Sequence, residues 1–239
     1  VYRRFVKDRT GYLERSERWW KEAVFRRFYD DKRHLNDVAL WSEGDGRPVD
    51  GSGYLVYRTQ GDWPERRLVI QEFVALSGGA YNGLLRYALS HDLHSEVVWH
   101  GPVDDPIAYT LDDSDRVKRE FEDDLMLRVI DLEAAVAARP AGPGAQDSAF
   151  TLAITDAAAP WNQGTWRIEC SGSKLAAKRS SGPGDLAMDA ATFAAVYDGF
   201  LRASDAVRSG LAEASDHNAA TIVDRIFAVP RPPFGSDFF

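Results

Sequence analysis

Alanine and charged residues are distributed unevenly along this 239-residue chain, and the change falls near residue 131. Residues 1–131 contain 20 Lys and Arg, 25 Asp and Glu, and 6 Ala, whereas residues 132–239 contain 9, 12 and 25. A chain of this length has room for one large domain or two small ones. Because the two parts differ so strongly in composition, we predict two domains, at residues 1–130 and 131–239. The Pro- and Gly-rich stretch 138–148 is an alternative boundary and reads as a surface connection.

The first part alternates between strand and helix patterns. We predict a helix over 16–30 with Ser16 as its N-cap, and another over 80–91. Residues 38–42, 51–59, 68–76 and 96–99 read as strands, of which LVIQEFVAL (68–76) is apolar on nearly both faces and therefore central. The charged segment 114–124 reads as a further helix. The order strand, strand, strand, helix, strand predicts an α/β sheet with at least one crossover.

The second part is predicted to be α+β, with a twisted sheet covered by alanine-rich helices. Strands are expected at 150–155, 165–171 and 174–179, the last two joined as a hairpin by Ser171-Gly172-Ser173. Helices are expected near 131–139 and over 189–198, 204–213 and 216–227. Asp189 and Ser204 are plausible N-caps for two of these helices.

Composition and charge exclude several classes of protein. The net charge of −8 argues against a general nucleic-acid-binding surface. No run of about 18 apolar residues is present, so we expect no membrane span, and the first residues lack a secretory signal. The single cysteine, Cys170, excludes an internal disulfide framework and is typical of a cytoplasmic protein.

Few residues form a known catalytic pattern. His91, His94 and His100 would make a zinc site only if the fold brought them together, and surface histidines are the simpler interpretation. Cys170 lies beside Glu169, which disfavours a reactive thiolate, so we expect a packed thiol. Gly-x-Ser-x-Gly and GxxxxGK[ST] motifs are absent, which disfavours a serine hydrolase or a P-loop enzyme.

A glycine-rich segment, Ser77–Gly83, joins the central strand to the next helix. Such a loop at a helix N-terminus can bind a pyrophosphate, and N-acetyltransferases of the GNAT superfamily hold coenzyme A at this topological position. Their loops normally carry an additional basic residue, whereas no Arg or Lys lies between Arg67 and Arg86 here, and Gly83 falls within the expected helix. We therefore predict a structural loop that binds no cofactor, and no metal site in this chain.

The chain ends in AVPRPPFGSDFF, with three prolines and three phenylalanines. Three Phe side chains near a terminus are costly to leave in water, and prolines reduce the entropy lost on docking. We expect this tail to pack into a groove, either in this chain or in a part outside it. A docked tail would deliver the carboxylate of Phe239 as a possible proton acceptor.

Three segments together resemble the enhanced intracellular survival (Eis) family of bacterial acetyltransferases. RTGYLERSERWW (9–20) is similar to that family's entry to its central domain, with Thr10 in place of a proline. EDDLMLRVIDLEAAVAAR (122–139) is similar to the junction between the last two domains, with Met126 in place of a tryptophan. The Pro-rich ending with a final Phe resembles the family's C-terminus.

The resemblance implies a GNAT-like mixed sheet followed by a sterol-carrier-protein-like domain. It also implies that the N-terminal catalytic GNAT domain, which binds acetyl-CoA, is absent from this chain, so that the chain alone is inactive. The substrate would be a cationic amine, of aminoglycoside or lysine type. The role of a catalytic terminal carboxylate falls on Phe239, with Asp237 and Phe238 near the substrate, and a homo-oligomer is expected.

Two alternatives remain open at this stage. The second domain could be a lipid-binding module that buries an acyl chain or a sterol between its sheet and helices. The two domains could instead serve mainly as a scaffold for oligomer contacts.

Overall fold

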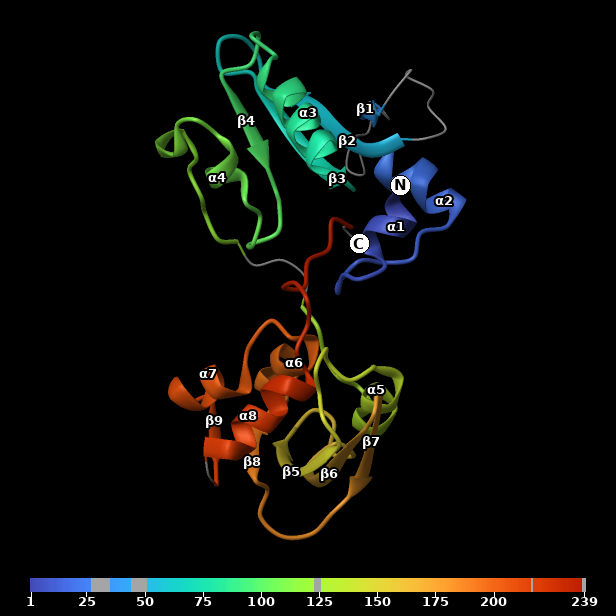
Figure 1. Cartoon of the computed structure of the whole chain (residues 1–239), viewed down its shortest axis with the longest axis vertical. Coiled ribbons are helices and arrows are strands. Elements are labelled where there is room, and N and C mark those ends of the chain that lie inside the picture. Colours follow the sequence, from blue (N-terminus) through green and yellow to red (C-terminus); the bar gives the residue numbers. More distant parts are fainter. Residues whose placement is uncertain (27–34, 44–50, 123–125, 216, 238–239) are drawn as a thin grey trace. The chain divides into compact units, whose positions relative to one another are not determined.

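The computed structural model describes residues 1–26, 35–43, 51–122, 126–215 and 217–237, and the chain divides into two compact units (Figure 1). The first unit is Val1–Asp123 together with Phe234–Phe239, and the second is Asp124–Pro233. The second unit thus begins a few residues before the predicted boundary at 130/131. The tail, which we assigned to the second domain, packs with the first unit instead.

A four-stranded mixed sheet with the order β1-β2-β3-β4 forms the centre of the first unit. β1, β2 and β3 are antiparallel, whereas β4 is parallel to β3 because helix α3 carries the chain across the sheet. The predicted order of strands and helix is therefore confirmed. The elements are α1 (Tyr2–Val6), α2 (Glu17–Trp19), the π-helical turn η1 (Trp20–Val24), β1 (Asp37–Ser42), β2 (Gly51–Gln60), β3 (Arg67–Ala75), α3 (Gly78–Leu89), β4 (Glu96–Trp99), α4 (Ile107–Thr110) and the 3-10 turn η3 (Ser114–Arg116).

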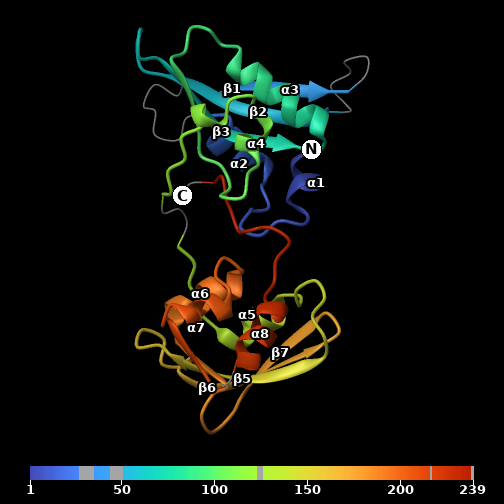
Figure 2. The same cartoon turned by 60° about the vertical axis from the view of Figure 1, so that its left-hand side comes forward.

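Both faces of this sheet are covered. On one face α3 packs on β2 and β3 through Leu84, Leu85 and Ala88. On the other face Tyr2 of α1 and Val24 of η1 pack against a second set of strand side chains: Tyr54, Val56 and Val74. Figure 2 shows α3 on one side of the strands and α1 and α2 on the other. The central strand β3 is therefore buried on both sides, as the apolar pattern of residues 68–76 predicts.

Two predicted helices of the first unit are wrong in extent. In the segment 114–124, residues 114–122 form a single 3-10 turn at their start, and Phe121 is 84% exposed, whereas residues 123 and 124 lie outside the described residues. Its apolar residues are too few to cover a face of the sheet, so the charged sequence has no packing to stabilise a helix. The helix predicted over 16–30 is reduced to α2 and η1, with Ser16 as its N-cap, as expected. Residues 27–30 lie outside the described residues.

The second unit contains a five-stranded sheet with the order β7-β6-β5-β8-β9. Three strands run antiparallel, β8 is parallel to β5, and β9 closes the edge. The short strands β8 and β9 were not predicted, because three or four residues carry too little periodicity. The elements are α5 (Leu132–Ala138), β5 (Ser148–Thr155), β6 (Gly164–Ser171), β7 (Lys174–Arg179), β8 (Leu186–Asp189), α6 (Ala190–Asp198), α7 (Ala203–Arg208), β9 (Ala212–Ala214) and α8 (His217–Ile226).

Of the two helix N-caps predicted in the second unit, one is confirmed and the other is wrong. Asp189 accepts a hydrogen bond from Thr192 N at 2.7 Å and caps α6, as predicted. Ser204 is not an N-cap, because α7 begins one residue earlier and the Ser204 hydroxyl donates to Asp224. The stretch 138–148 connects α5 to β5 and therefore lies inside this unit.

The space between the sheet and the helices of the second unit is filled by side chains. Phe150, Ile168, Phe193, Val223 and Ile226 are each at most 3% exposed and belong to one cluster. The lipid-binding alternative stays a prediction, and this cluster gives it no support. Among the described residues, no helix is long and apolar enough to cross a membrane.

Candidate functional site

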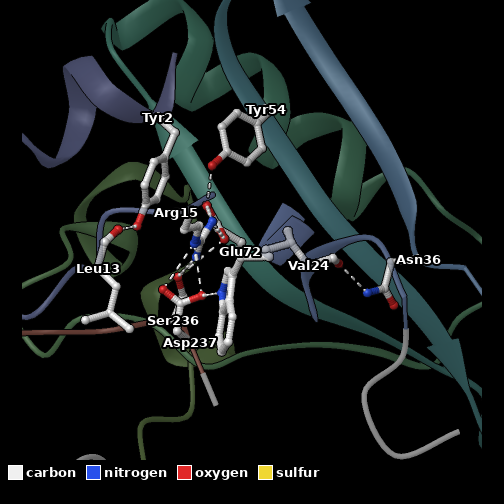
Figure 3. Close-up of polar contacts among 10 residues, drawn as sticks. Tyr2, Leu13, Arg15, Val24, Asn36, Tyr54, Glu72, Ser236 and Asp237 are labelled. Carbon is white, nitrogen blue, oxygen red and sulfur yellow. Dashed lines mark hydrogen bonds and ion pairs between the residues drawn. The ribbon is translucent and has the colours of Figure 1, made fainter. Parts of the chain in front are cut away.

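A buried arginine lies where the N-terminal segment, strand β3 and the C-terminal tail meet (Figure 3). The Arg15 side chain is 1% exposed. Its Nε donates to both carboxylate oxygens of Asp237, at 2.9 and 3.1 Å, and its second terminal nitrogen donates to Ser236 Oγ at 3.0 Å. Its first terminal nitrogen lies 2.7 Å from Glu72 Oε2. We call Arg15, Glu72 and Asp237 the tail anchor.

Aromatic rings surround the guanidinium of the tail anchor. The carbon Cζ of Arg15 lies 4.2 Å from the ring centre of Tyr2 and 4.7 Å from that of Trp20. A cation over an aromatic face is attracted by the ring quadrupole, more strongly when water is excluded. The rings thus hold the guanidinium in place between the two carboxylates.

A β-bulge turns Glu72 toward Arg15. In the pairing of β2 with β3, Tyr57 faces Ile70 but Val56 faces Glu72, so that Gln71 is an extra residue in β3. A bulge of this kind reverses which face the following side chains occupy. Without it Glu72 would lie on the face of Ile70, in the apolar core under α3. The bulge instead places the carboxylate where Arg15 and Tyr54, which donates a hydrogen bond to it, can pair with it.

The tail itself packs along the N-terminal segment. Phe234 N donates to Thr10 O at 3.1 Å, and the rings of Tyr12 and Phe234 lie 5.9 Å apart, edge to face. Gly11 has a φ of +94°, and a Cβ there would lie 2.6 Å from Phe234 O. A glycine is therefore needed at this position, both for its backbone conformation and for the close approach of the tail.

The tail anchor holds one positive and two negative groups away from water. Burial alone would lower the pKa of Arg15, but Glu72 and Asp237 raise it overall, so the guanidinium stays charged. Burial raises the pKa of Glu72, against the opposing effects of Arg15 and Tyr54. Burial also raises the pKa of Tyr2 to about 12. The net effect is a raised pKa for Glu72, which the charge of Arg15 limits.

Of the three tail residues predicted to form the site, the structure describes Asp237. It is 5% exposed, and its carboxylate also accepts a hydrogen bond from Trp19 Nε1 at 2.7 Å. The predicted packing of the tail in a groove is confirmed for residues 234–237. Phe238 and Phe239 lie outside the described residues, so their predicted roles stay predictions. Since the Asp237 carboxylate is paired with Arg15 and Trp19, its geometry suits an anchor rather than a contact to a substrate.

Cys170 is packed as predicted, and the three histidines do not come together among the described residues. Cys170 is buried and burial raises the pKa of its thiol. The rings of His91 and His94 lie 5.7 Å apart, whereas His100 faces Glu122 at 3.5 Å. Within the part of the chain that the structure describes, no three His, Cys, Asp or Glu side chains gather as a metal site would require.

The glycine-rich segment is the second place that the sequence singles out. Ser77 caps α3 by accepting a hydrogen bond from Ala80 N at 3.1 Å, and its hydroxyl donates to the Glu43 carboxylate. Glu43 Oε1 lies 3.4 Å from the position of a Cβ on Gly79. A carboxylate of this chain is therefore already present at the N-terminus of α3, where the backbone amides and the helix dipole favour an anion.

Arg15 and Glu72 were not identified from the sequence. The available signal was a glutamate within an otherwise apolar central strand, because a buried carboxylate requires a cationic or hydrogen-bonding partner. The arginine stands in a segment with several other charges, and only the fold separates it from them.

Comparisons with protein families give the same two parts. Residues 11–129 match the model of an acetyltransferase (GNAT) domain, and residues 132–235 match that of a sterol carrier protein domain. An uncharacterized N-acetyltransferase of Streptomyces coelicolor is 31% identical over 231 residues, covering 90% of this chain and 54% of the relative. Another, of Streptomyces avermitilis, is 31% identical over 209 residues, covering 83% and 48%. This chain therefore spans about half the length of these relatives.

Solved structures share the fold. A GCN5-related N-acetyltransferase from Anabaena variabilis matches all of this chain and 58% of its own, with a TM-score of 0.81 and 22% identity. Eis1 from Mycobacterium abscessus matches 81% of this chain and 49% of its own, with a TM-score of 0.65 and 28% identity.

One expectation from the sequence is corrected by these matches. We expected the catalytic GNAT domain to be absent from this chain, but residues 11–129 match an acetyltransferase (GNAT) domain. The expectation came from the resemblance to the last two domains of the Eis family, with which the unusual glycine-rich segment agreed, whereas the fold depends on the parallel pairing of β3 with β4 across α3. The predicted mixed α/β sheet followed by a sterol-carrier-like domain is confirmed: this chain consists of an acetyltransferase (GNAT) domain followed by a sterol carrier protein domain.

Proposed function

We propose that the protein acts in N-acetyl transfer from acetyl-CoA to an amine of a cationic substrate, as an Eis-like acetyltransferase. The relatives named above as N-acetyltransferases and the likeness to Eis1 support the reaction class. The net charge of −8 suits a cationic substrate. The observation on which we rely most is the tail anchor, which fixes Asp237 two residues before Phe239.

In this proposal the amine attacks the acetyl carbonyl of acetyl-CoA, coenzyme A leaves as its thiolate, and the carboxylate of Phe239 accepts the proton that the amine loses. An α-carboxyl group has an ordinary pKa of about 3.3–3.7, and an apolar surrounding raises that pKa. A carboxylate held near the amine can therefore act as a general base. Phe238 and Phe239 would contribute an apolar surface beside it.

Truncation and extension of the tail test this role. Deleting Phe239, or adding residues after it, should lower the rate of acetyl transfer by the native protein about 100-fold, because general-base catalysis typically contributes 10²–10⁴-fold. The matched control is Phe239→Leu, which keeps the carboxylate at the same place in the chain and should retain most of the rate. An unchanged rate after deletion or extension would remove the terminal carboxylate from the mechanism.

The glycine-rich segment does not fit the diphosphate of acetyl-CoA. Glu43 already lies at the N-terminus of α3, and a second anion there would be repelled. The ring of Trp41 packs against Gly83, and Phe73, Tyr81 and Trp99 pack together where β3 continues beyond its pairing with β4. We therefore propose that this chain does not bind acetyl-CoA at residues 77–83.

Titration of the isolated chain with acetyl-CoA checks this proposal. We expect the amide resonances of Gly78 and Gly79 to stay unchanged in ¹⁵N NMR spectra at millimolar ligand, because a carboxylate occupies the position of the anion. Glu43→Gln provides the comparison, since it removes the charge but keeps the shape of the side chain. Saturable shifts of both glycines in the unmodified chain would contradict the proposal.

A further inference from the structure

Strand β1 forms one edge of the first sheet. Within the described residues the sheet has the order β1-β2-β3-β4, so β1 pairs with β2 on one side only. Edge strands are usually bulged, covered or protected by charged side chains, because their free amides and carbonyls can pair with a further strand. Residues 38–42 (VALWS) carry no charge, and the register of β1 is regular until its last step, between Trp41 and Ser42. This edge therefore lacks the usual protection.

One face of β1 exposes large apolar side chains. Val38 and Leu40 are paired with Val56 and Tyr54 of β2 and lie on the same face as these residues. Val56 and Tyr54 are buried, at 0% and 6% exposure, whereas Val38 is 43% and Leu40 61% exposed. An apolar row that continues from a buried strand onto an exposed edge marks a surface that a partner can cover.

The sequence of β1 is complementary to itself in one antiparallel register. A two-fold axis through Ala39 places Val38 of each copy opposite Leu40 of the other copy. Residues directly opposite each other in an antiparallel pair share a face, so the exposed apolar side chains of the two copies would meet. Both apolar pairs would then continue the row that Val56 and Tyr54 begin.

The same register offers a hydrogen-bond acceptor to Trp41. Its Nε1 is buried and has no acceptor among the described residues. The benzo edge of the indole faces Gly83 of α3, so Nε1 lies on the edge of the ring that is turned away from that helix. With the axis at Ala39, Asp37 of the second copy lies directly opposite Trp41 and brings a carboxylate to this side of the sheet.

We propose that β1 is a docking edge for a second copy of this chain, and that two copies pair antiparallel about Ala39. The two four-stranded sheets would then form one continuous sheet. A second copy is the occupant because the strand complements itself, with apolar residues opposite apolar residues and Asp37 opposite Trp41. Residues 37–41 supply far fewer contacts than the roughly 20–30 residues a side of a standard interface, so the dimer should dissociate on dilution.

Sedimentation equilibrium of this chain over a wide range of concentrations measures the association. We expect the mass to rise with concentration from 26.6 kDa towards twice that value. Leu40→Lys should keep the chain monomeric, because a lysine on an edge strand opposes pairing. Leu211→Lys is the matched control, since Leu211 of the second unit is 54% exposed, and it should leave the association unchanged. Circular dichroism spectra equal to that of the unmodified chain would verify that both variants are folded.

Cysteine cross-linking tests the register itself. In Ala39→Cys the two introduced thiols would lie directly opposite each other, at the Cα separation of about 4.5–5.5 Å that suits a disulfide. Mild oxidation should therefore give a covalent dimer, visible by gel electrophoresis without reductant. Leu40→Cys is the comparison and should cross-link much less, because Val38 lies opposite it in this register. The native Cys170 is buried, and the unmodified chain gives its background.

Three results would overturn the inference. The first is a chain that stays monomeric at every concentration and whose Ala39→Cys variant forms no cross-link. The second is a dimer that persists in Leu40→Lys, because its interface must then lie elsewhere. The third is stronger cross-linking at Leu40→Cys than at Ala39→Cys, because the strands would then pair about a different residue.

Discussion

Replacing Arg15 with methionine should lower the free energy of unfolding of the first unit by about 3–5 kcal/mol, because it leaves two carboxylates buried without their cation. Methionine fills much of the volume of arginine, so the loss measures charge pairing more than packing. Thermal unfolding monitored by circular dichroism gives the change. Burial already raises the pKa of Glu72, and removal of Arg15, which opposes that shift, should raise it further.

Arg18→Met is the matched control, because Arg18 is exposed and lies three residues along the same segment. Surface substitutions of this kind usually change stability by less than about 0.5 kcal/mol. Equal melting temperatures for Arg15→Met and the unmodified chain would show that the buried network contributes nothing to stability.

Replacing Gly83 with alanine should destabilise the first unit by about 1–3 kcal/mol, despite alanine's higher helix propensity. A Cβ at Gly83 would lie 2.1 Å from Trp41 Cζ3, far inside any contact distance. Trp41 is packed between α3 and the sheet, so the ring has to move or the helix has to shift. Denaturant unfolding monitored by circular dichroism reports the change in stability.

Gly78→Ala, in the same helix, is the comparison, and we expect it to raise the stability that Gly83→Ala lowers. No atom lies within 4 Å of a Cβ at Gly78, so alanine is accommodated and should stabilise the helix by up to about 1 kcal/mol. A loss of stability at Gly78 as large as at Gly83 would mean that helix packing against Trp41 is not the cause.

The order of elements could be predicted because long strands and helices carry their own periodicity. The apolar run 68–76 identified the central strand β3, and the Ser-Gly-Ser turn identified the hairpin of β6 and β7. The charged segment 114–124 misled the prediction, since helix propensity without an apolar face does not form a stable helix. The strands β8 and β9 depend on pairing with β5 and with each other, which no local pattern reveals.

Of the tail anchor, only the residue on the tail could be predicted from the sequence. Clustered aromatic residues at the terminus indicated a docked tail, and Asp237 was named for its proximity to Phe239. The contact of Glu72 with Arg15 depends on a one-residue bulge at Gln71, and a bulge depends on the register of two strands. A sequence in isolation fixes no register, so the meeting of Arg15 with Glu72 could not be foreseen.

The order of the segments along the chain also determines when each unit can be completed during synthesis. Residues 124–233 form the second unit, yet the first unit is complete only once the segment after it has docked. A domain ordinarily folds as it leaves the ribosome, ahead of the domains encoded after it. Here Arg15 and Glu72 would wait for their last carboxylate until translation reaches residue 237, and a prematurely terminated product would carry an incomplete first unit that quality-control proteases can recognise.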